Sequence, residues 1–169
     1  MTVSDRLLMD PMTAEELEAF IRYSRQAYTG ARVAHGGEDP REAEAVAAQQ
    51  YADFFPDGEP AEGHSLFTGR DATTRERIGI LWLFEGRSAA GTSVFVYDVE
   101  VEEDQRGRGW GRELMAYGEQ WASERGAYEI ALNVFGGNAR ARGLYTSLGY
   151  SERFVGMAKP LSSPTPVSP

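Results

Sequence analysis

The chain of 169 residues contains no cysteine. This absence excludes a disulfide framework, a thiolate metal site and a cysteine nucleophile. Long apolar runs are missing too: the longest, from Ile78 to Phe84, is far shorter than the roughly 18 residues that cross a bilayer. The first residues also lack the charged and then apolar pattern of a leader peptide. We therefore expect a soluble cytoplasmic protein with no membrane partner.

Basic residues are scarce relative to acidic ones: 17 Lys and Arg stand against 26 Asp and Glu, a net charge of −9. This balance argues against nucleic acid as the main partner, since phosphate contacts need a basic surface, and it favours a cationic substrate. The apolar share of 41% and the charged share of 25% are ordinary for a globular protein. We expect a single domain over residues 1–161 and a disordered Ser/Pro-rich tail over residues 162–169.

Helix signals alternate with strand signals along the chain. Thr13 and Glu16 have the spacing of a capping box, and Asp39 followed by Pro40 is a second helix start. The expected helices cover about residues 13–26, 39–55, 109–126 and 138–149, and the expected strands cover 6–9, 65–69, 78–85, 92–101, 128–135 and 150–158. This order of elements predicts an α/β fold with a mixed sheet and helices on both faces.

The most informative stretch is a glycine-rich turn. Residues 105–112 read Gln-Arg-Gly-Arg-Gly-Trp-Gly-Arg and lead from a strand into an amphipathic helix. Backbone N–H groups at a helix start, with the positive end of the helix dipole behind them, form an anion site. A P-loop is excluded because its Lys and its Ser or Thr are missing, and a dinucleotide fingerprint is excluded because Arg112 replaces a glycine. The alternative is a turn that only connects strand and helix, although Arg106, Arg108 and Arg112 form a basic island in an acidic chain.

Two motifs carry a resemblance to a known family. The first is Arg/Gln-x-x-Gly-x-Gly at residues 106–111. The second is an asparagine, a tyrosine two helical turns later and a closing Gly-aromatic pair, within residues 138–150. Together they resemble the signatures of the GNAT acyltransferase superfamily over about residues 94–159. The resemblance implies a GNAT-type acyl-CoA N-acyltransferase fold with a central twisted mixed sheet of about six or seven strands.

The resemblance also implies an activity. It predicts an N-acetyltransferase that moves the acetyl group of acetyl-CoA to a primary amine of a small molecule or peptide. The amine attacks directly in a ternary complex, and we expect no metal. The alternative is a non-catalytic acyl-CoA-binding sensor or interaction module with the same fold. RNA binding is disfavoured because only one Arg-Gly-Arg-Gly element occurs in an acidic chain; the assembly is expected to be a monomer or a homodimer.

The second motif supplies the expected general acid. Asn138 and Tyr145 are two helical turns apart and therefore share one face of the expected helix. By resemblance, Asn138 contacts the pantetheine or phosphate arm and Tyr145 lies near the thioester sulfur. A phenol with a pKa of about 10 stays protonated at neutral pH and can give its proton to the departing thiolate. The alternatives are that Asn138 only caps the helix and that Tyr145 only packs in the core.

By resemblance, acyl-CoA binds where the strands at 92–101 and 128–135 diverge. Backbone groups around Val99 to Val101 would then hold the pantetheine arm and polarise the thioester carbonyl. The expected coenzyme-binding residues are Val99, Val101, Arg106, Gly107, Arg108, Gly109, Trp110, Gly111, Arg112, Asn133 and Asn138.

The candidates for the general base are two acids of one expected strand. Asp98 and Glu100 fall on the same side of an otherwise apolar strand, and burying carboxylates there is costly unless they are paired or used. Some family members use a glutamate where this chain has Asn133, which cannot accept a proton. Three options stand: Glu100, Asp98, or no dedicated base with an amine that arrives neutral. The structural alternative is that both acids pair with arginines.

The remaining notable residues are expected to be structural. Trp82 and Trp121 have the spacing of packing residues, and His64 is expected at the surface. Residues 28–39, rich in glycine and charge, are expected to connect the first two helices. By resemblance this segment borders the acceptor pocket, and the sequence assigns no role to any single residue in it.

Overall fold

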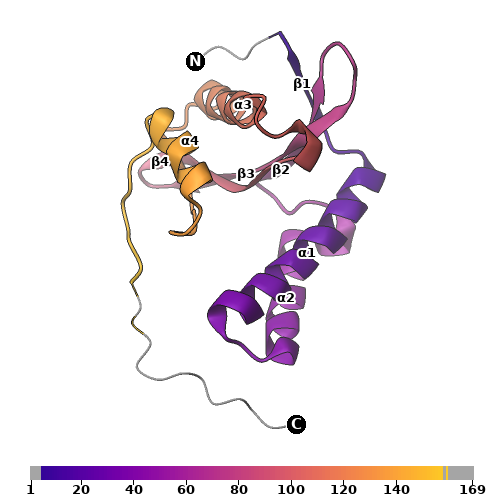
Figure 1. The fold of residues 1–169 in the computed structure, drawn as a ribbon, viewed down its shortest axis with the longest axis vertical. Coiled ribbons are helices and arrows are strands. Elements are labelled where there is room, and N and C mark those ends of the chain that lie inside the picture. The colour runs from indigo at the N-terminus through magenta and orange to yellow at the C-terminus, as the bar shows by residue number, and fades with distance from the viewer. Residues whose placement is uncertain (1–4, 158, 160–169) are drawn as a thin grey trace. The chain divides into compact units, whose positions relative to one another are not determined.

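The computed structural model describes residues 5–157 and residue 159. The chain forms two compact units, Met1–Asn133 and Val134–Pro169. The first unit contains β1 (Leu7–Pro11), α1 (Ala14–Gly36), α2 (Pro40–Phe54), the short 3₁₀ helix η1 (Pro56–Gly58), β2 (His64–Asp71), β3 (Arg77–Ser88), β4 (Gly91–Val101), η2 (Glu103–Gln105), α3 (Trp110–Glu124) and β5 (Glu129–Leu132), and the second contains α4 (Ala139–Ser147) (Figure 1). The single domain expected over residues 1–161 stays a prediction, and the expected tail lies outside the described residues.

The strands of the first unit form one mixed sheet in the order β1–β2–β3–β4–β5. Strands β1 to β4 pair antiparallel, and β5 pairs parallel with β4. This is the predicted class of sheet, with five strands in the described part of the chain against about six or seven expected. The sequence predicts a strand over residues 150–158, but residues 150–157 form none. The strand propensity of a sequence depends on its context, and here these residues pair with no neighbouring strand. Residue 158 lies outside the described residues.

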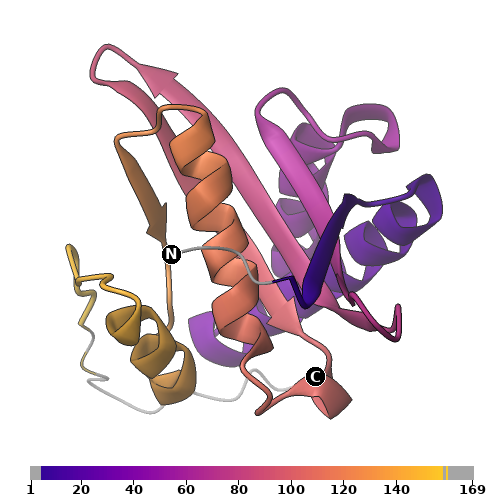
Figure 2. The ribbon, with the colours of Figure 1, turned by 90° about the horizontal axis from the view of Figure 1, so that it is seen from above.

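Helix α3 covers one face of the sheet (Figure 2). Its side facing the sheet is buried and includes Leu114, Met115 and Trp121. A Cβ on Gly118 would lie 3.4 Å from the Leu81 side chain. The backbone of α3 at this glycine therefore packs directly against β3, at a distance that leaves room for one methyl group in ordinary contact.

Helices α1 and α2 cover the opposite face (Figure 2). Thr13 and Glu16 form the predicted capping box at the start of α1. Asp39 caps α2 by accepting hydrogen bonds from the backbone N–H groups of Arg41 and Glu42. Both helix starts are therefore fixed by local polar groups that the sequence makes visible.

Helix α1 is longer than the sequence indicates. Its expected end lies near residue 26, whereas the helix continues to Gly36. Tyr28 packs against Tyr51 of α2, with 6.4 Å between the ring centroids. This tertiary contact outweighs the low helix propensity of Gly30. Much of the segment expected to connect the two helices is therefore helical.

Strand β3 is buried on both faces. Ile80 and Trp82 pack in a cluster with residues of α1 and α2, whereas Leu81 and Leu83 lie next to Gly118 of α3. A strand covered on both sides needs apolar residues at every position. The longest apolar run of the sequence is this strand, and Trp82 is a packing residue as predicted.

A β-bulge interrupts β4 where it pairs with β3. Trp82 pairs with Asp98 and Leu83 pairs with Val96, so Tyr97 is an extra residue between two paired ones. A bulge re-aims the residues that follow it. Because residues paired across two strands share a face, Asp98 lies on the face where Trp82 contacts α1 and α2.

Candidate active site

The glycine-rich turn between β4 and α3 presents a row of backbone N–H groups. Gly107 and Gly109 have φ angles of 81° and 85°, which a glycine adopts without strain. A Cβ on either would meet nothing within 4 Å, so the space beside the turn is open. The described residues supply no acceptor to the N–H groups of residues 107–111, whereas the N–H of Arg112 donates to the carbonyl of Gly109 at 3.0 Å. This open row at a helix start fits an anion.

Side chains around the turn hold it in place. The Trp110 side chain is buried in the core, and the Arg6 guanidinium lies 3.7 Å from the centre of its ring. The buried Gln105 accepts a hydrogen bond from Arg108 at 3.1 Å. These contacts hold the backbone of the turn in place. Because the Trp110 side chain is buried, any contact of Trp110 with a coenzyme would come from its backbone N–H.

Strand β5 is shorter than β4. All four residues of β5, Glu129–Leu132, pair with Ser93–Val96, and β4 continues to Val101. The divergence of the two strands beyond this point stays a prediction. The N–H of Glu102, directly after β4, donates to the carbonyl of Ile78 in β3 at 2.9 Å. N–H groups alternate between the two sides of a strand. Because the N–H of Glu102 points toward β3, those of Val99 and Val101 point away from β3, to the edge of β4 beyond the last residue paired with β5. This free edge of β4 is the expected site of the pantetheine arm, a role that stays a prediction.

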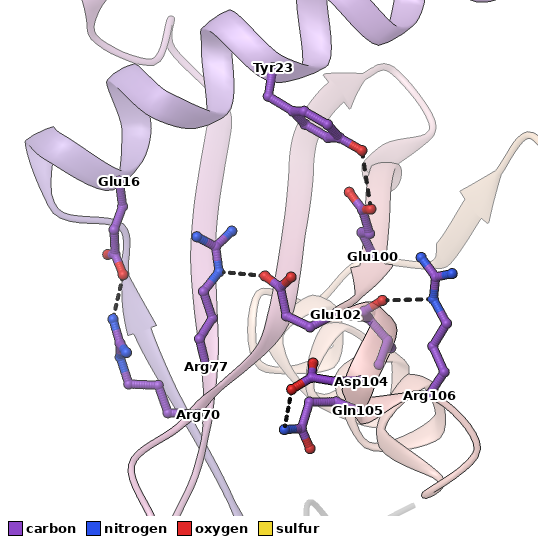
Figure 3. A network of polar contacts seen from close by, with 10 residues as sticks. Glu16, Tyr23, Arg70, Arg77, Glu100, Glu102, Asp104, Gln105 and Arg106 are labelled. Atoms are coloured by element: carbon purple, nitrogen blue, oxygen red, sulfur yellow. Dashed lines mark hydrogen bonds and ion pairs between the residues drawn. The ribbon is translucent and has the colours of Figure 1, made fainter.

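A cavity of about 420 Å³ lies between β4 and α1 (Figure 3). Its lining includes Phe20 and Tyr23 of α1, Arg77 and Ile80 of β3, Glu100 of β4, and Glu102 and Arg106 beyond it. Arg77 Nε pairs with a Glu102 carboxylate oxygen at 2.9 Å, and Arg106 Nε donates to the carbonyl of Val101 at 3.1 Å. The volume is in the range of pockets for small molecules, about 300–1,000 Å³.

Asp98 and Glu100 lie on the same face of β4, as predicted. They pair with Trp82 and Ile80 of β3, whose side chains pack against α1 and α2. Burial, first, and the negative charge of Glu100, second, together raise the pKa of Asp98 to about 6, against the opposing effect of a hydrogen bond from the Val99 N–H. Asp98 therefore titrates close to neutral pH, where a general base is most effective.

Of Asp98 and Glu100, it is Glu100 that lines the cavity, next to Glu102 and Glu103. The Tyr23 hydroxyl donates to its Oε1 at 3.4 Å, and the charge of Glu100 raises the pKa of Tyr23. Arg77 pairs with Glu102 instead. Among the described contacts, pairing with arginine therefore does not account for Glu100.

Tyr23 and Arg77 are site residues that the sequence analysis did not find. Tyr23 follows Phe20 by about one helical turn, so the sequence predicts that both lie on the same side of α1. It does not predict that Tyr23 contacts Glu100. Arg77 is the first residue of β3. The pairing of Gly79 with Val101 brings the start of β3 next to the end of β4, and this places Arg77 beside Glu102. Only the register of the sheet reveals that pairing.

The prediction that His64 lies at the surface is wrong. His64 is half-buried, and its Nδ1 accepts a hydrogen bond from Trp82 Nε1 at 2.9 Å. Its ring lies 4.7 Å from that of Phe84 and 5.2 Å from that of Tyr97. Burial lowers the pKa of His64. Its place at the start of β2 beside the aromatic face of β3 explains the burial.

The second unit holds the other expected site residues. The Asn138 side chain accepts a hydrogen bond from the Ala141 N–H at 3.0 Å and caps α4, which is one of the two readings of this residue. The Tyr145 ring lies 5.9 Å from the ring of Tyr150. The coenzyme contact of Asn138 and the proton transfer by Tyr145 stay predictions, as does the role of Asn133, which is exposed after β5.

Comparison of the sequence and the fold with known proteins identifies the family to which the chain belongs. The sequence matches the Acetyltransferase (GNAT) family over residues 18–150. The chain belongs to this family. The uncharacterized N-acetyltransferase YycN of Bacillus subtilis is 28% identical over 155 residues, which are 92% of this chain and 99% of that protein. The uncharacterized N-acetyltransferase YdgE of the same organism is 31% identical over 153 residues, which are 90% and 97% of the two chains.

The solved structure of Bacillus subtilis YycN matches this GNAT chain with a TM-score of 0.82 and 28% identity, covering 93% of this chain and 99% of that one. The chain is therefore an acyltransferase of a family whose cosubstrate is acetyl-CoA. Over the described residues, no helix has the length and apolar character to span a membrane. Within the same residues, no cluster of three or more His, Cys, Asp or Glu side chains suits a metal ion.

Proposed function

We propose that this GNAT enzyme transfers the acetyl group of acetyl-CoA to a primary amine by direct attack in a ternary complex. One observation carries the proposal. Within three successive residues, β4 carries the N–H groups of Val99 and Val101 on its free edge and the Glu100 carboxylate in the cavity. A thioester held on the free edge and an amine held in the cavity would meet at this point of the strand.

The groups of the chain fit the parts of acetyl-CoA. The open N–H row of residues 107–111 suits a diphosphate, and Arg108 adds positive charge beside it. The free edge of β4 suits the amide groups of the pantetheine arm. The coenzyme contacts expected of Arg112, Asn133 and Asn138 belong to the same proposal. Acetyl-CoA supplies the activated acyl group.

The chain then has four chemical tasks. Glu100 binds the ammonium group and accepts its proton, so that the neutral nitrogen can attack. The nitrogen forms a bond to the carbonyl carbon, the carbon–sulfur bond breaks, and the extra proton that the nitrogen then carries passes to solvent water, which leaves the neutral amide. The N–H of Val101 stabilises the negative charge on the carbonyl oxygen, since that of Val99 donates to Asp98. Tyr145 gives its proton to the departing thiolate, which needs a protonated phenol at neutral pH.

Asp98 is the second candidate for the base. Its pKa of about 6 suits proton transfer near neutral pH. Of these two acids, however, it is Glu100 that lines the cavity, and Tyr23 already orients it. We therefore propose that Glu100 accepts the proton of the amine. Asp98 is the neighbouring acid whose charge interacts with that of Glu100.

The test is the release of free thiol from acetyl-CoA in the presence of a panel of amines, next to calorimetry of acetyl-CoA binding. We expect binding, and thiol release with at least one amine. Binding without release from any amine would favour the non-catalytic sensor. Absence of binding would overturn the coenzyme site itself.

A further inference from the structure

The cavity between β4 and α1 contains charges of both signs. Glu100 is the acid oriented by Tyr23, and the guanidinium groups of Arg77 and Arg106 line the same cavity. Figure 3 shows Glu100 with these two arginines, and it shows Glu102, a further acid of the lining, paired with Arg77. A pocket that bound only an ammonium group would gain nothing from two arginines, because like charges repel.

Each of the two arginines is held by its Nε. Arg77 Nε pairs with Glu102 at 2.9 Å, and Arg106 Nε donates to the Val101 carbonyl at 3.1 Å. A guanidinium has five N–H donors, and the outer pair of nitrogens can bind an oxyanion in bidentate fashion. Among the hydrogen bonds of the described residues, none occupies the outer nitrogens of Arg77 or Arg106, although the charge of Arg77 is paired with that of Glu102. Both side chains are thus held in place with their binding edges available.

We infer that the acceptor carries an oxyanion, a carboxylate or a phosphate, in addition to the amine that is acetylated. This inference rests on the proposed function, because it assigns the acceptor to the cavity that Glu100 lines. Glu100 binds the ammonium group of the acceptor, and Arg77 binds the oxyanion, while Arg106 keeps its expected place at the coenzyme. The acceptor class is therefore an amino acid or an amino sugar phosphate rather than a simple polyamine.

The size of the cavity agrees with this class. Its volume of about 420 Å³ lies at the lower end of the range for small-molecule pockets. The negative net charge of −9 draws cationic groups to the protein as a whole. A second binding group is then needed to select among amines, and buried or partly buried charge pairing is a strong source of such selection.

Matched pairs of amines test the inference. Each pair has one member with the oxyanion and one without it: lysine and cadaverine, ornithine and putrescine, tyrosine and tyramine, and glucosamine 6-phosphate and glucosamine. We expect at least one acid-bearing member to have a kcat/KM at least about tenfold above that of its partner. The amino acid pairs report a carboxylate, and the sugar pair reports a phosphate.

Variants of the chain test whether Arg77 causes the preference for the acid-bearing amine. Arg77→Gln should reduce the preference for the acid-bearing member about tenfold or more, mainly through KM. Glu102→Gln breaks the same ion pair but keeps the guanidinium, so the preference should remain. Arg87→Gln is the outside control, because Arg87 lies at the far end of β3, is 81% exposed and pairs with Glu85.

The outcomes separate the inference from the proposed function. Thiol release with no preference in any pair overturns the inference and leaves the proposed function in place. A preference that Arg77→Gln keeps also overturns the assignment of the oxyanion to this arginine. No release with any of the amines, although acetyl-CoA binds, overturns the proposed function and the inference with it.

Discussion

The hydroxyl of Tyr23 on α1 donates to Oε1 of Glu100 on β4 at 3.4 Å. This contact joins the helix above the cavity to the strand below it (Figure 3). It also leaves the second oxygen of Glu100 available, since a carboxylate accepts several hydrogen bonds. The acid proposed to bind the amine is therefore oriented before the acceptor arrives, which lowers the cost of binding.

Removing the Tyr23 hydroxyl tests this orientation. Tyr23→Phe should raise the KM of the acceptor by a factor of about 3 to 10, the value of one hydrogen bond, and leave the Kd of acetyl-CoA unchanged. Steady-state kinetics and calorimetry measure the two constants. Tyr128→Phe is the control, because Tyr128 is 57% exposed outside the cavity. An unchanged acceptor KM would show that Glu100 needs no orienting group.

A side chain at Gly109 should block the coenzyme. Gly109→Leu places a Cβ in the open space beside the N–H row, and we expect the Kd of acetyl-CoA to rise by a factor of about 10 to 100. Gly126→Leu is the matched control, since Gly126 also has a positive φ, 67° against 85°, with open space around it. Both variants carry the same backbone strain, so thermal melting should fall similarly in both. Equal coenzyme affinity in the two variants would remove the diphosphate from this turn.

The parts of the fold that the sequence predicts are those set by local chemistry. The capping box at Thr13, the cap at Asp39 and the glycine turn before Trp110 are each encoded within a few residues. The alternation that places Asp98 and Glu100 on one face is also local, because side chains in a strand point to alternate sides.

The parts that the sequence misses depend on contacts between distant residues. The helical segment after residue 26 is stabilised by packing of Tyr28 on Tyr51, and the burial of His64 depends on its pairing with Trp82. The approach of Tyr23 to Glu100 likewise joins residues far apart in the chain. No local pattern carries such information, so these features become visible only in the folded chain.

Tyr145→Phe tests the general acid. The change removes only the hydroxyl, so we expect kcat to fall by a factor of about 100 to 10,000, while the Kd of acetyl-CoA stays the same. Tyr150→Phe is a useful comparison, because the two rings are neighbours at 5.9 Å and the second phenol has no proposed part in the reaction. Single-turnover kinetics with a good acceptor measure the effect. An undiminished rate in Tyr145→Phe would show that this residue only packs.

The raised pKa of Asp98 predicts a dependence of stability on pH. Its pKa is about 6 in the folded chain against 3.8 for an ordinary aspartate. Between these values the folded state binds more protons than the unfolded state, so the contribution of Asp98 to stability is largest at low pH and is lost as the pH rises through about 6. Asp98→Asn should therefore become more stable than the unchanged chain as the pH rises from about 4 to about 7, by at most about 3 kcal/mol.

Urea unfolding of both proteins across that pH range measures the difference. Asp53→Asn is the control, because Asp53 lies exposed on α2 and its removal shows the effect of one surface charge. A difference between Asp98→Asn and the unchanged chain that stays constant with pH would show that burial does not raise the pKa of Asp98.

The pH dependence of the rate decides between the two carboxylates. Glu100→Gln keeps the shape of the side chain and its contact with Tyr23 but cannot accept a proton, so kcat/KM should fall by a factor of about 100 to 10,000. The decline of activity toward acidic pH should flatten in this variant, because the group whose protonation causes it is gone. In Asp98→Asn the decline should persist. If instead the decline persists in Glu100→Gln and disappears in Asp98→Asn, Asp98 is the base and Glu100 only binds the amine. If it persists in both, the amine itself loses its proton to water before it attacks.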